Sequence, residues 1–427
     1  MERLGIPTVT IATTDFLGLA KNTALSQGAA DVCFVVVPHP MGMIGLGDIQ
    51  KKAKDVFPEI LKAATEWKPV AKLPPMKPPY PAERFKFKGS IEDLNKFFFE
   101  KGRSLGLPII PPTPERVAEM LRGTSHKPDE VVWIVPPRMG VLTVELAAVH
   151  AVMAGCKPEY LPVILAAIEA MSEPIYNWRG ATTTTGTVGP MLLINGPIVK
   201  ELGIAYGQGA AAGGYHPNVS IGYTINLIGD IIGGSKSPEV DKSTFGSPAD
   251  IVAWVFGENE DANPWESYAV EHGFKPTDNV ITMKNVYPTI DMPDHSSSTP
   301  EAHMTWWKHR VTPLGSPLCL KPGEFFFVLA PEQARMLAKA GWTKDKFRKT
   351  LWKEARVPLS TWGTGAEMCG IGPVPKEFSP ATPDTLIPIT LTPEEIEIVV
   401  AGGSGKHSQV FTPGQGNTVS KLVDKWK

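Results

Sequence analysis

The chain has 427 residues, of which 42% are hydrophobic and 20% charged, so it is long enough for two or three domains with sizeable cores. Its 42 Lys and Arg residues nearly balance its 44 Asp and Glu residues, which excludes a net basic field for nucleic acid or for an anionic membrane surface. The 42 Pro and 40 Gly residues favour many specified turns over a helical bundle.

We predict neither a secretion signal nor a membrane-spanning helix. The N-terminal segment lacks a basic stretch followed by a long apolar one, and no run approaches 18 apolar residues. The four cysteines are widely spaced and include no CxxC pair: Cys33, Cys156, Cys319 and Cys369. We therefore expect a cytoplasmic protein without a disulfide framework.

Residues 1–68 are predicted to form a small βαβα unit. A β-branched run at 8–12 precedes a helix-like segment at 15–26, and the continuously apolar run 32–37 is typical of a strand buried in a parallel sheet. An amphipathic helix follows from Asp48 to Trp67. Six prolines between 69 and 81 then predict an extended linker over 69–88.

Residues 89–427 are predicted to form a larger α/β region. Ser90 and Thr113 have the sequence context of helix N-caps. Further helices are expected at 143–154, 161–171, 331–341 and 344–356, and strands at 131–135, 324–329 and 396–400. The predicted fold class is α/β, a βαβα parallel-sheet unit joined by a Pro-rich linker to a larger α/β region.

The first candidate site follows the strand at 32–37, because ligands of open α/β sheets bind beyond the carboxyl ends of strands. His39 lies there between Pro38 and Pro40, and Gly42 and Gly45 precede the next helix. The glycines would let an anion approach the free N–H groups of the helix start. The spacing does not match GxGxxG, and a structural turn is the alternative.

The second candidate site is the glycine-rich loop after the strand at 396–400. It is not a Walker motif, yet its backbone amides and its lysine could hold a carboxylate or phosphate. The predicted anion ligands are Gly403, Ser404, Gly405, Lys406 and Ser408. His407 is a candidate proton donor or acceptor, and an ordinary glycine turn is the alternative.

The third candidate site is the threonine run 182–185. Its hydroxyls and amides could line a polar pocket, with Thr183, Thr184 and Asn195 as candidate ligands. A β-branched edge strand is the alternative.

The fourth candidate site is the acidic loop 256–266. Clustered carboxylates raise one another's pKa, which suits Glu258 and Glu260 to general acid–base chemistry. The loop could instead bind a hard cation or be a solvated turn.

Cys156 is the leading candidate for a reactive thiol, since it follows the end of a predicted helix. A helix C-terminus raises a thiol pKa, so an inert buried cysteine is the alternative. His295, His303 and His309 lie close in sequence without HExxH spacing, and the metal and cofactor content stays unassigned.

Two parts of the chain resemble known families. Residues 7–67, with Pro7-Thr8-Val9-Thr10 and Val36-Val37-Pro38-His39-Pro40, resemble the C-terminal half of the small UGSC-type (seleno)proteins. Residues 90–427 resemble the larger uncharacterised protein that accompanies that family. The stretches that carry this second resemblance are 107–116, 152–162, 194–197, 258–260, 264–266 and 399–408.

The resemblance implies an enzyme subunit without specifying its reaction. UGSC-type proteins carry a Sec/Cys-Gly-Ser-Cys motif, expected to be redox-active, and no such motif occurs in this chain. Either the activity does not need that dithiol, or a separate chain supplies it.

We therefore expect an enzyme, or its large subunit, acting on a small polar or anionic metabolite in a pocket shared by the His39 and His407 loops. With a small Cys- or Sec-containing partner chain, the reaction would be a thiol- or selenol-linked reduction. Without one, a lyase or hydrolase reaction at His and Glu is the alternative, and a non-catalytic scaffold is a third. We expect no nucleic-acid or membrane partner and leave homo-oligomerisation open.

Overall fold

The structure is a computed structural model, and it describes residues 8–26, 29, 32–42, 44–66, 80–312, 323–362, 380 and 382–427. Helices and strands alternate along the chain, so the predicted α/β class is confirmed. Residues 69–79 of the predicted linker 69–88 lie outside the described residues.

The N-terminal unit has the predicted βαβα order. Its elements are β1 (Thr10–Thr13), α1 (Leu17–Ser26), β2 (Phe34–Val37) and α2 (Leu46–Glu66). β1 and β2 pair in parallel, Thr10 opposite Phe34. Val35, Val37, Val56 and Ala63 form its small core, so α2 packs on the sheet through one face.

A helical layer follows. It contains α3 (Ile91–Glu100), α4 (Pro114–Met120), α5 (Val144–Met153), α6 (Leu161–Ser172), α7 (Trp178–Ala181) and α9 (His216–Ile231), together with the hairpin of β3 (Val131–Val135) and β4 (Gly140–Thr143). Ser90 and Thr113 cap α3 and α4 as the sequence predicts, since each side chain accepts a hydrogen bond from a first-turn N–H group.

The first of two four-stranded sheets has the order β14-β7-β5-β6. Its strands are β5 (Gly189–Asn195), β6 (Trp254–Gly257), β7 (Val280–Val286) and β14 (Val419–Leu422). β5 and β6 are parallel, and the other two pairings are antiparallel. Two short helices, α8 (Ile198–Glu201) and α10 (Tyr268–Glu271), lie between these strands in the chain.

The second sheet has the order β12-β9-β13-β8. Its strands are β8 (Ile290–Pro293), β9 (Phe325–Leu329), β12 (Ile396–Val400) and β13 (His407–Phe411). The associated helices are α11 (Pro300–Val311), α12 (Pro331–Lys339) and α13 (Lys344–Glu354). A separate antiparallel pair joins β10 (Arg356–Pro358) to β11 (Leu386–Pro388).

The two sheets have the same internal design. In each, a parallel pair (β5 and β6, or β9 and β12) is extended by an antiparallel strand (β7 or β13) and then by an edge strand. That edge strand comes from the other half of the chain, because β8 follows β7 but pairs with β13, and β14 follows β13 but pairs with β7. The two halves therefore exchange their last strands.

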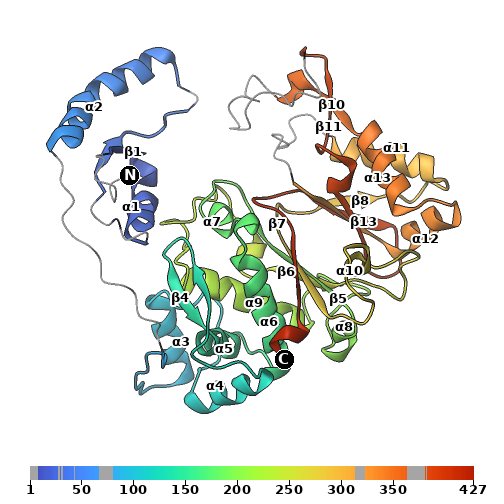
Figure 1. Cartoon of the computed structure of the whole chain (residues 1–427), viewed down its shortest axis with the longest axis horizontal. Helices are drawn as coiled ribbons and strands as arrows, with labels where there is room; N and C mark the ends of the chain where they lie inside the picture. The colour runs from blue at the N-terminus through green and yellow to red at the C-terminus, as the bar shows by residue number, and fades with distance from the viewer. Residues whose placement is uncertain are drawn as a thin grey trace.

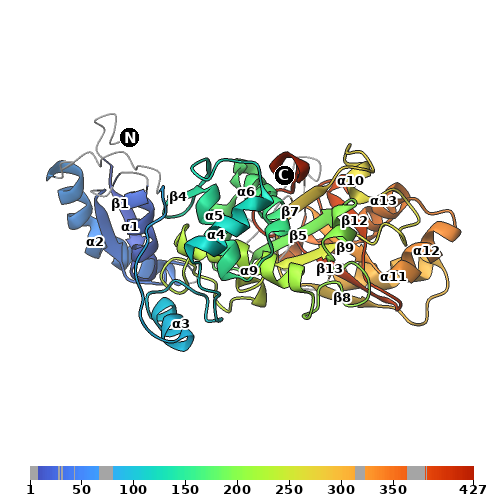
Figure 2. The ribbon, with the colours of Figure 1, turned by 90° about the horizontal axis from the view of Figure 1, so that it is seen from below.

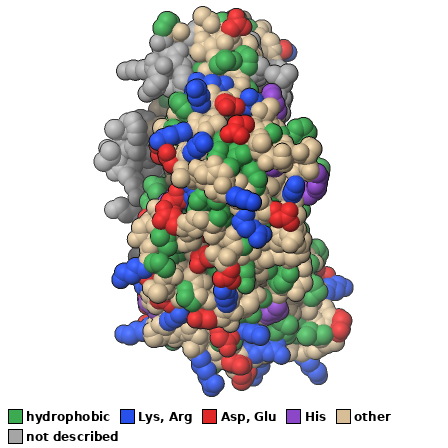
Figure 3. All heavy atoms as spheres, turned by 90° about the vertical axis from the view of Figure 1, so that its right-hand side faces the viewer, with side chains coloured by type: hydrophobic (Ala, Val, Ile, Leu, Met, Phe, Trp, Pro, Cys, Tyr) green, Lys and Arg blue, Asp and Glu red, His purple; other side chains and the backbone are tan. Residues whose placement is uncertain are grey.

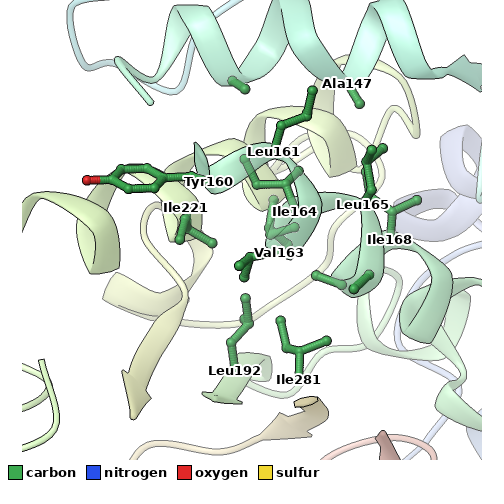
Figure 4. Close-up of a cluster of buried hydrophobic side chains, with 14 of the residues drawn as sticks. Ala147, Tyr160, Leu161, Val163, Ile164, Leu165, Ile168, Leu192, Ile221 and Ile281 are labelled. Carbon is green, nitrogen blue, oxygen red and sulfur yellow. The ribbon is translucent and has the colours of Figure 1, made fainter. Parts of the chain in front are cut away.

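The sheets stack face to face between two layers of helices (Figures 1 and 2). Met191 and Leu193 of β5 belong to one apolar core with Phe326 and Val328 of β9, between the two sheets. The alternate β5 residues belong to the core that faces the helices. Figure 4 shows this helix-facing core, in which Leu192 and Ile281 of the sheet meet side chains of α5, α6 and α9.

In both ribbon views the β1 label lies toward one end of the long axis and the β13 label lies in the opposite half (Figures 1 and 2). α1 approaches the body at the loop before Asp241, where a Cβ atom placed on Gly18 would be 3.6 Å from the Glu239 carbonyl oxygen. Acidic and basic side chains alternate on the face shown in Figure 3, without a field of one sign. Among the described residues, no helix is long and apolar enough to cross a membrane.

Candidate functional site

His39 lies at the carboxyl edge of the two-stranded sheet, as the strand order predicts. Its Nδ1 is 3.2 Å from Thr13 Oγ1, and its backbone N–H donates to Thr14 Oγ1. Lys52 Nζ donates to the carbonyls of Pro38 and Pro40 and fixes the loop around the imidazole. The loop is therefore held by its own contacts.

Two glycines of this loop, Gly42 and Gly45, have open surroundings. A Cβ atom on Gly42 would meet nothing within 4 Å, and one on Gly45 would meet only the Asp48 side chain at 3.8 Å. Both glycines are exposed to solvent, so their role as anion ligands stays a prediction.

The late glycine loop packs against the loop that follows α8 and against α12. A Cβ atom on Gly403 would lie 2.2 Å from Gln208 Oε1, and the Gly405 N–H donates to Glu332 Oε1 at 3.0 Å. Ser408 is buried, accepts a hydrogen bond from Ala330 N and donates to Gln333 Oε1. The prediction of Ser408 as an anion ligand is wrong, because its hydroxyl is used inside the fold.

Two residues of that loop remain available, since Ser404 is exposed and Lys406 half-buried. His407 lies beside them in an exposed acid–base chain. Its Nδ1 is 3.0 Å from Asp291 Oδ2, and its Nε2 is 3.1 Å from His295 Nε2.

The shared cavity expected between His39 and His407 is absent. The His39 loop follows β2, which pairs with β1, and the His407 loop precedes β13. In both ribbon views β1 and β13 lie in opposite halves of the molecule. The physical reason is the intervening layer structure: two helical layers and two sheets are built from residues between these loops.

Glu258 is a buried connector between the sheets rather than an open acid–base group. Its two carboxylate oxygens accept hydrogen bonds from Asn195 Nδ2 at 2.6 Å, Tyr268 N at 2.7 Å and Asn263 Nδ2 at 2.8 Å. The Val400 N–H of β12 adds a fourth contact at 3.4 Å. Burial raises the pKa of Glu258 against the opposing effects of Lys344 and these donors.

Glu260 shares the same amide. Its Oε1 accepts from Asn195 Nδ2 at 2.8 Å and from Gly196 N at 3.0 Å. The structure thus brings together Asn195, Glu258 and Glu260, which the sequence analysis placed in two separate candidate sites. Asn259 ties this cluster to the late glycine loop, since its N–H donates to the Val400 carbonyl and its Nδ2 to the Gly402 carbonyl.

Cys156 is not a reactive thiol. Its Sγ is 3.3 Å from Thr224 Oγ1, and the residue packs against the main helical core. Burial raises the pKa of its thiol to about 11, so the nucleophilic thiolate is scarce at neutral pH. These contacts and the raised pKa favour the alternative of an inert cysteine.

The threonine run is a turn rather than a strand, since β5 begins only at Gly189. Thr183 Oγ1 donates to the Arg179 carbonyl at 2.8 Å, and Thr184 Oγ1 accepts from Gly186 N at 3.1 Å. These two hydroxyls hold the turn. The neighbouring Thr182, however, lines a small polar cavity that no sequence motif indicated.

This cavity, the aspartate cavity, is defined by Asp230, Asp241 and Asp250 and has a volume of about 40 Å³. That is room for about three water-sized groups. Asp230 ends α9, whereas Asp241 and Asp250 come from the loop before β6. Its other walls are Trp178, Ala181, Thr182, Val188, Pro190, Asn226, Ser235 and Asn285.

Burial changes the protonation of this cluster. It raises the pKa of Asp230 to about 7 and that of Asp250 to about 6, and it also raises the pKa of Asp241. The neighbouring carboxylates reinforce the shift of Asp230, while Lys236 opposes it. Such carboxyl groups exchange protons near neutral pH, which ordinary aspartates do not.

Two polar atoms of the cavity walls have no hydrogen-bond partner. Asn285 is completely buried, and its Oδ1 is unpaired, although its Nδ2 donates to the Tyr176 carbonyl at 2.9 Å. Trp178 is 5% exposed, and its Nε1–H is unpaired as well. Unpaired buried polar atoms are costly, so a wall that keeps two of them indicates a site for a bound group.

A larger cavity of about 640 Å³ lies near the C-terminus, between Arg122, Glu159, Glu201 and Lys427. None of its lining residues has a buried unpaired polar side-chain atom. We therefore favour the smaller cavity as the candidate site. Over the part of the chain that is described, no group of three His, Cys, Asp or Glu side chains has the arrangement of a metal site.

Sequence analysis missed the aspartate cavity because its carboxylates are spread over 21 positions without a motif. One signal was available: Asp230 and Asp250 flank a segment rich in Gly, Ser and Pro, which predicts a long loop returning to its start.

One family model matches the N-terminal part of the chain. Residues 1–66 match the model of the UGSC family. The matched stretch includes β1, α1, β2 and α2 and therefore ends with the βαβα unit. No curated protein and no solved structure matches the chain.

Proposed function

We propose that the protein is an enzyme that performs acid–base chemistry, of the lyase or hydrolase type, on a small polar metabolite in the aspartate cavity. The observation that carries the proposal is the position of Asp230. Its side chain lines a partly buried cavity together with two further carboxyl groups, and its pKa is raised to about 7. A group with that pKa is both protonated and ionised in useful amounts near pH 7.

The cavity supports separate roles for its carboxyl groups. Ser235 Oγ donates to Asp230 Oδ1 at 2.9 Å and orients this side chain as the proton donor. Asp250 has the lower pKa, about 6, so it is mostly ionised at pH 7 and serves as the proton acceptor. In an elimination, Asp250 would take a proton from the substrate and pass it through Asp230 to the leaving group.

Three carboxyl groups disfavour an anionic group in the cavity itself. For this cavity we therefore propose a polar metabolite in place of the anionic one that the sequence analysis allowed. An anion would have to contact another part of the protein, such as Lys406 at the late loop.

Comparative metabolite profiling tests the proposal. A cell extract incubated with the protein should lose a small polar metabolite, and Asp230→Asn should slow that loss about 100-fold. Glu260→Gln is the matched acidic control outside the cavity and should leave the rate unchanged. Equal turnover by the wild type and Asp230→Asn would refute the role of the aspartate cavity.

The match to the UGSC family favours a second candidate, a thiol- or selenol-linked reductase working with a partner chain. We infer that the matched stretch corresponds to the C-terminal half of that family. In support, the matched stretch contains no Cys-Gly-Ser-Cys motif, which UGSC-type proteins carry ahead of the part that it resembles. A small Cys-Gly-Ser-Cys chain that co-purifies and is required for turnover would favour the reductase. A complex whose activity survives loss of Asp230 would favour the scaffold alternative.

A further inference from the structure

The walls of the aspartate cavity offer far more hydrogen-bond acceptors than donors. One oxygen of each carboxyl group is engaged: Asp230 Oδ1 with Ser235 Oγ, Asp241 Oδ1 with Ser243 N at 2.9 Å, and Asp250 Oδ2 with Ser247 N at 2.6 Å. No hydrogen bond of ordinary length reaches the second oxygens, although the Ser243 hydroxyl lies close enough to Asp241 to lower its pKa.

The Asn285 Oδ1 atom adds a fourth acceptor. Its orientation is fixed because the Asn285 amide nitrogen donates to two backbone carbonyls, those of Tyr176 and Gln415. A rotated side chain would turn its oxygen toward these carbonyls and lose both bonds. The two hydrogen bonds of the nitrogen therefore hold the Asn285 side chain in one orientation, in which Oδ1 has no partner.

Most donors of the walls are already used. Thr182 Oγ1 donates to the Trp178 carbonyl at 3.0 Å, and Asn226 Nδ2 donates to the Ala249 carbonyl at 2.8 Å. The Trp178 indole N–H and the second N–H of the Asn226 amide have no hydrogen-bond partner. A group that satisfies this wall must bring several donors of its own.

The charge of the wall also favours a group that brings donors and a positive charge. No Lys, Arg or His is among the residues that line the cavity. Lys236 is the nearest cation to act on Asp230, but its Nζ lies against Gly102, where a Cβ atom would approach it to 1.9 Å. The three carboxyl groups therefore have no cationic partner inside the cavity.

We propose that the aspartate cavity binds the ammonium group of a primary amine. Three N–H donors and one positive charge match the unpaired oxygens of Asp230, Asp241 and Asp250, with Asn285 Oδ1 as a further acceptor. The volume admits the ammonium group and a short carbon stem, so the rest of the substrate lies outside the cavity. This inference rests on the proposed function, because it identifies the substrate class of the same site.

Two other cations fit less well. A metal ion requires a ligand geometry that the described residues do not form here. A quaternary ammonium ion has no N–H donor, so it would leave the acceptors unpaired.

Titration of the full-length protein with methylammonium chloride tests the proposal, with tetramethylammonium chloride at the same concentration as the reference. Isothermal calorimetry at pH 6.5, in two buffers of different ionisation enthalpy, should show methylammonium binding with proton release, because the cation favours the ionised carboxylates. Tetramethylammonium should bind at least tenfold more weakly. Equal affinities for the two ions, or binding without proton release, would overturn the proposal.

Variants locate the binding. Asp230→Asn and Asp250→Asn should each weaken methylammonium binding about tenfold or more, whereas Asp261→Asn, in an exposed ion pair with Lys200, should not change it. In protein labelled with 15N-tryptophan, methylammonium should shift one indole N–H signal, the one that Trp178→Phe removes. Unchanged affinity in both cavity variants would overturn the proposal.

Calorimetry and turnover separate this inference from the proposed function. If methylammonium binds as expected while Asp230→Asn keeps full turnover, the amine site stands and the catalytic proposal fails. If Asp230→Asn abolishes turnover while methylammonium does not bind, the catalytic cavity stands and the amine assignment fails.

Discussion

Asp230 shows how one residue acquires its chemistry from its position. It lies at the end of α9, where Ser235 is its hydrogen-bond donor and Asp241 and Asp250 are its charged neighbours. Water would keep an aspartate ionised at neutral pH, but burial removes part of that hydration and favours the protonated form. Its proton affinity is therefore a property of the fold.

The free energy of unfolding should depend on pH through the titration of Asp230. Its pKa rises from 3.8 to about 7 on folding, so the folded state holds a proton that the unfolded state releases between these values. The stability that the proton contributes is complete below about pH 4 and is lost as the pH rises through 7. Asp230→Asn should therefore reduce the loss of unfolding free energy between pH 5 and pH 8 by roughly 2 kcal/mol.

Urea denaturation at the two pH values measures this difference, and Asp261→Asn is the exposed control. An Asp230→Asn variant with the same pH dependence as the wild type would show that Asp230 titrates normally in the folded protein.

At the scale of elements, the ends of parallel strands are joined by one buried carboxylate. Glu258 follows β6 and contacts both Asn195 at the end of β5 and the Val400 N–H of β12. Every one of its partners is a donor, so an ionised carboxylate is the group that fits. The same strand ends that the sequence marked as catalytic are used here for packing.

A matched pair of substitutions tests this role. Glu258→Gln places an NH₂ group against donors on one side and should lower the free energy of unfolding by about 2–4 kcal/mol. Glu260→Gln keeps its single engaged oxygen as an amide oxygen and should cost less than about 1 kcal/mol. Chemical denaturation measures the loss of unfolding free energy in both variants. Similar losses would mean that Glu258 contributes no more to stability than Glu260.

At the scale of the whole molecule, the two sheets share their strands. β8 and β14 each complete the sheet of the other half, so neither half can lose its strands without exposing an edge in the other. A common apolar core that includes Leu193 and Phe326 adds to this coupling.

We therefore expect the two sheets to unfold in one cooperative transition. Amide hydrogen exchange should give β5 and β9 the same global opening free energy within about 1 kcal/mol. Deletion of residues 419–427, which removes β14, should lower the protection of β9 as well as that of β5. Protection of β9 that survives this deletion would show that the halves are independent.

Much of the secondary structure could be predicted from the sequence, because its signals are local. Proline- and threonine-capped helix starts, such as those of α4 and α13, and continuous apolar runs, such as β2 and β9, act within a few residues. α9 was missed, since its glycines and β-branched residues have low helix propensity and its stability comes from burial.

The sequence by itself therefore determined the α/β class, the βαβα unit and the capped helices, all of which depend on neighbours in the chain. Only the tertiary structure decided which polar groups meet. It separated His39 from His407, buried Glu258, packed Cys156 against the main helical core, and gathered Asp230, Asp241 and Asp250 around one cavity. The physical reason is that desolvation and charge–charge contacts depend on distances in space, which loop closure and sheet pairing set.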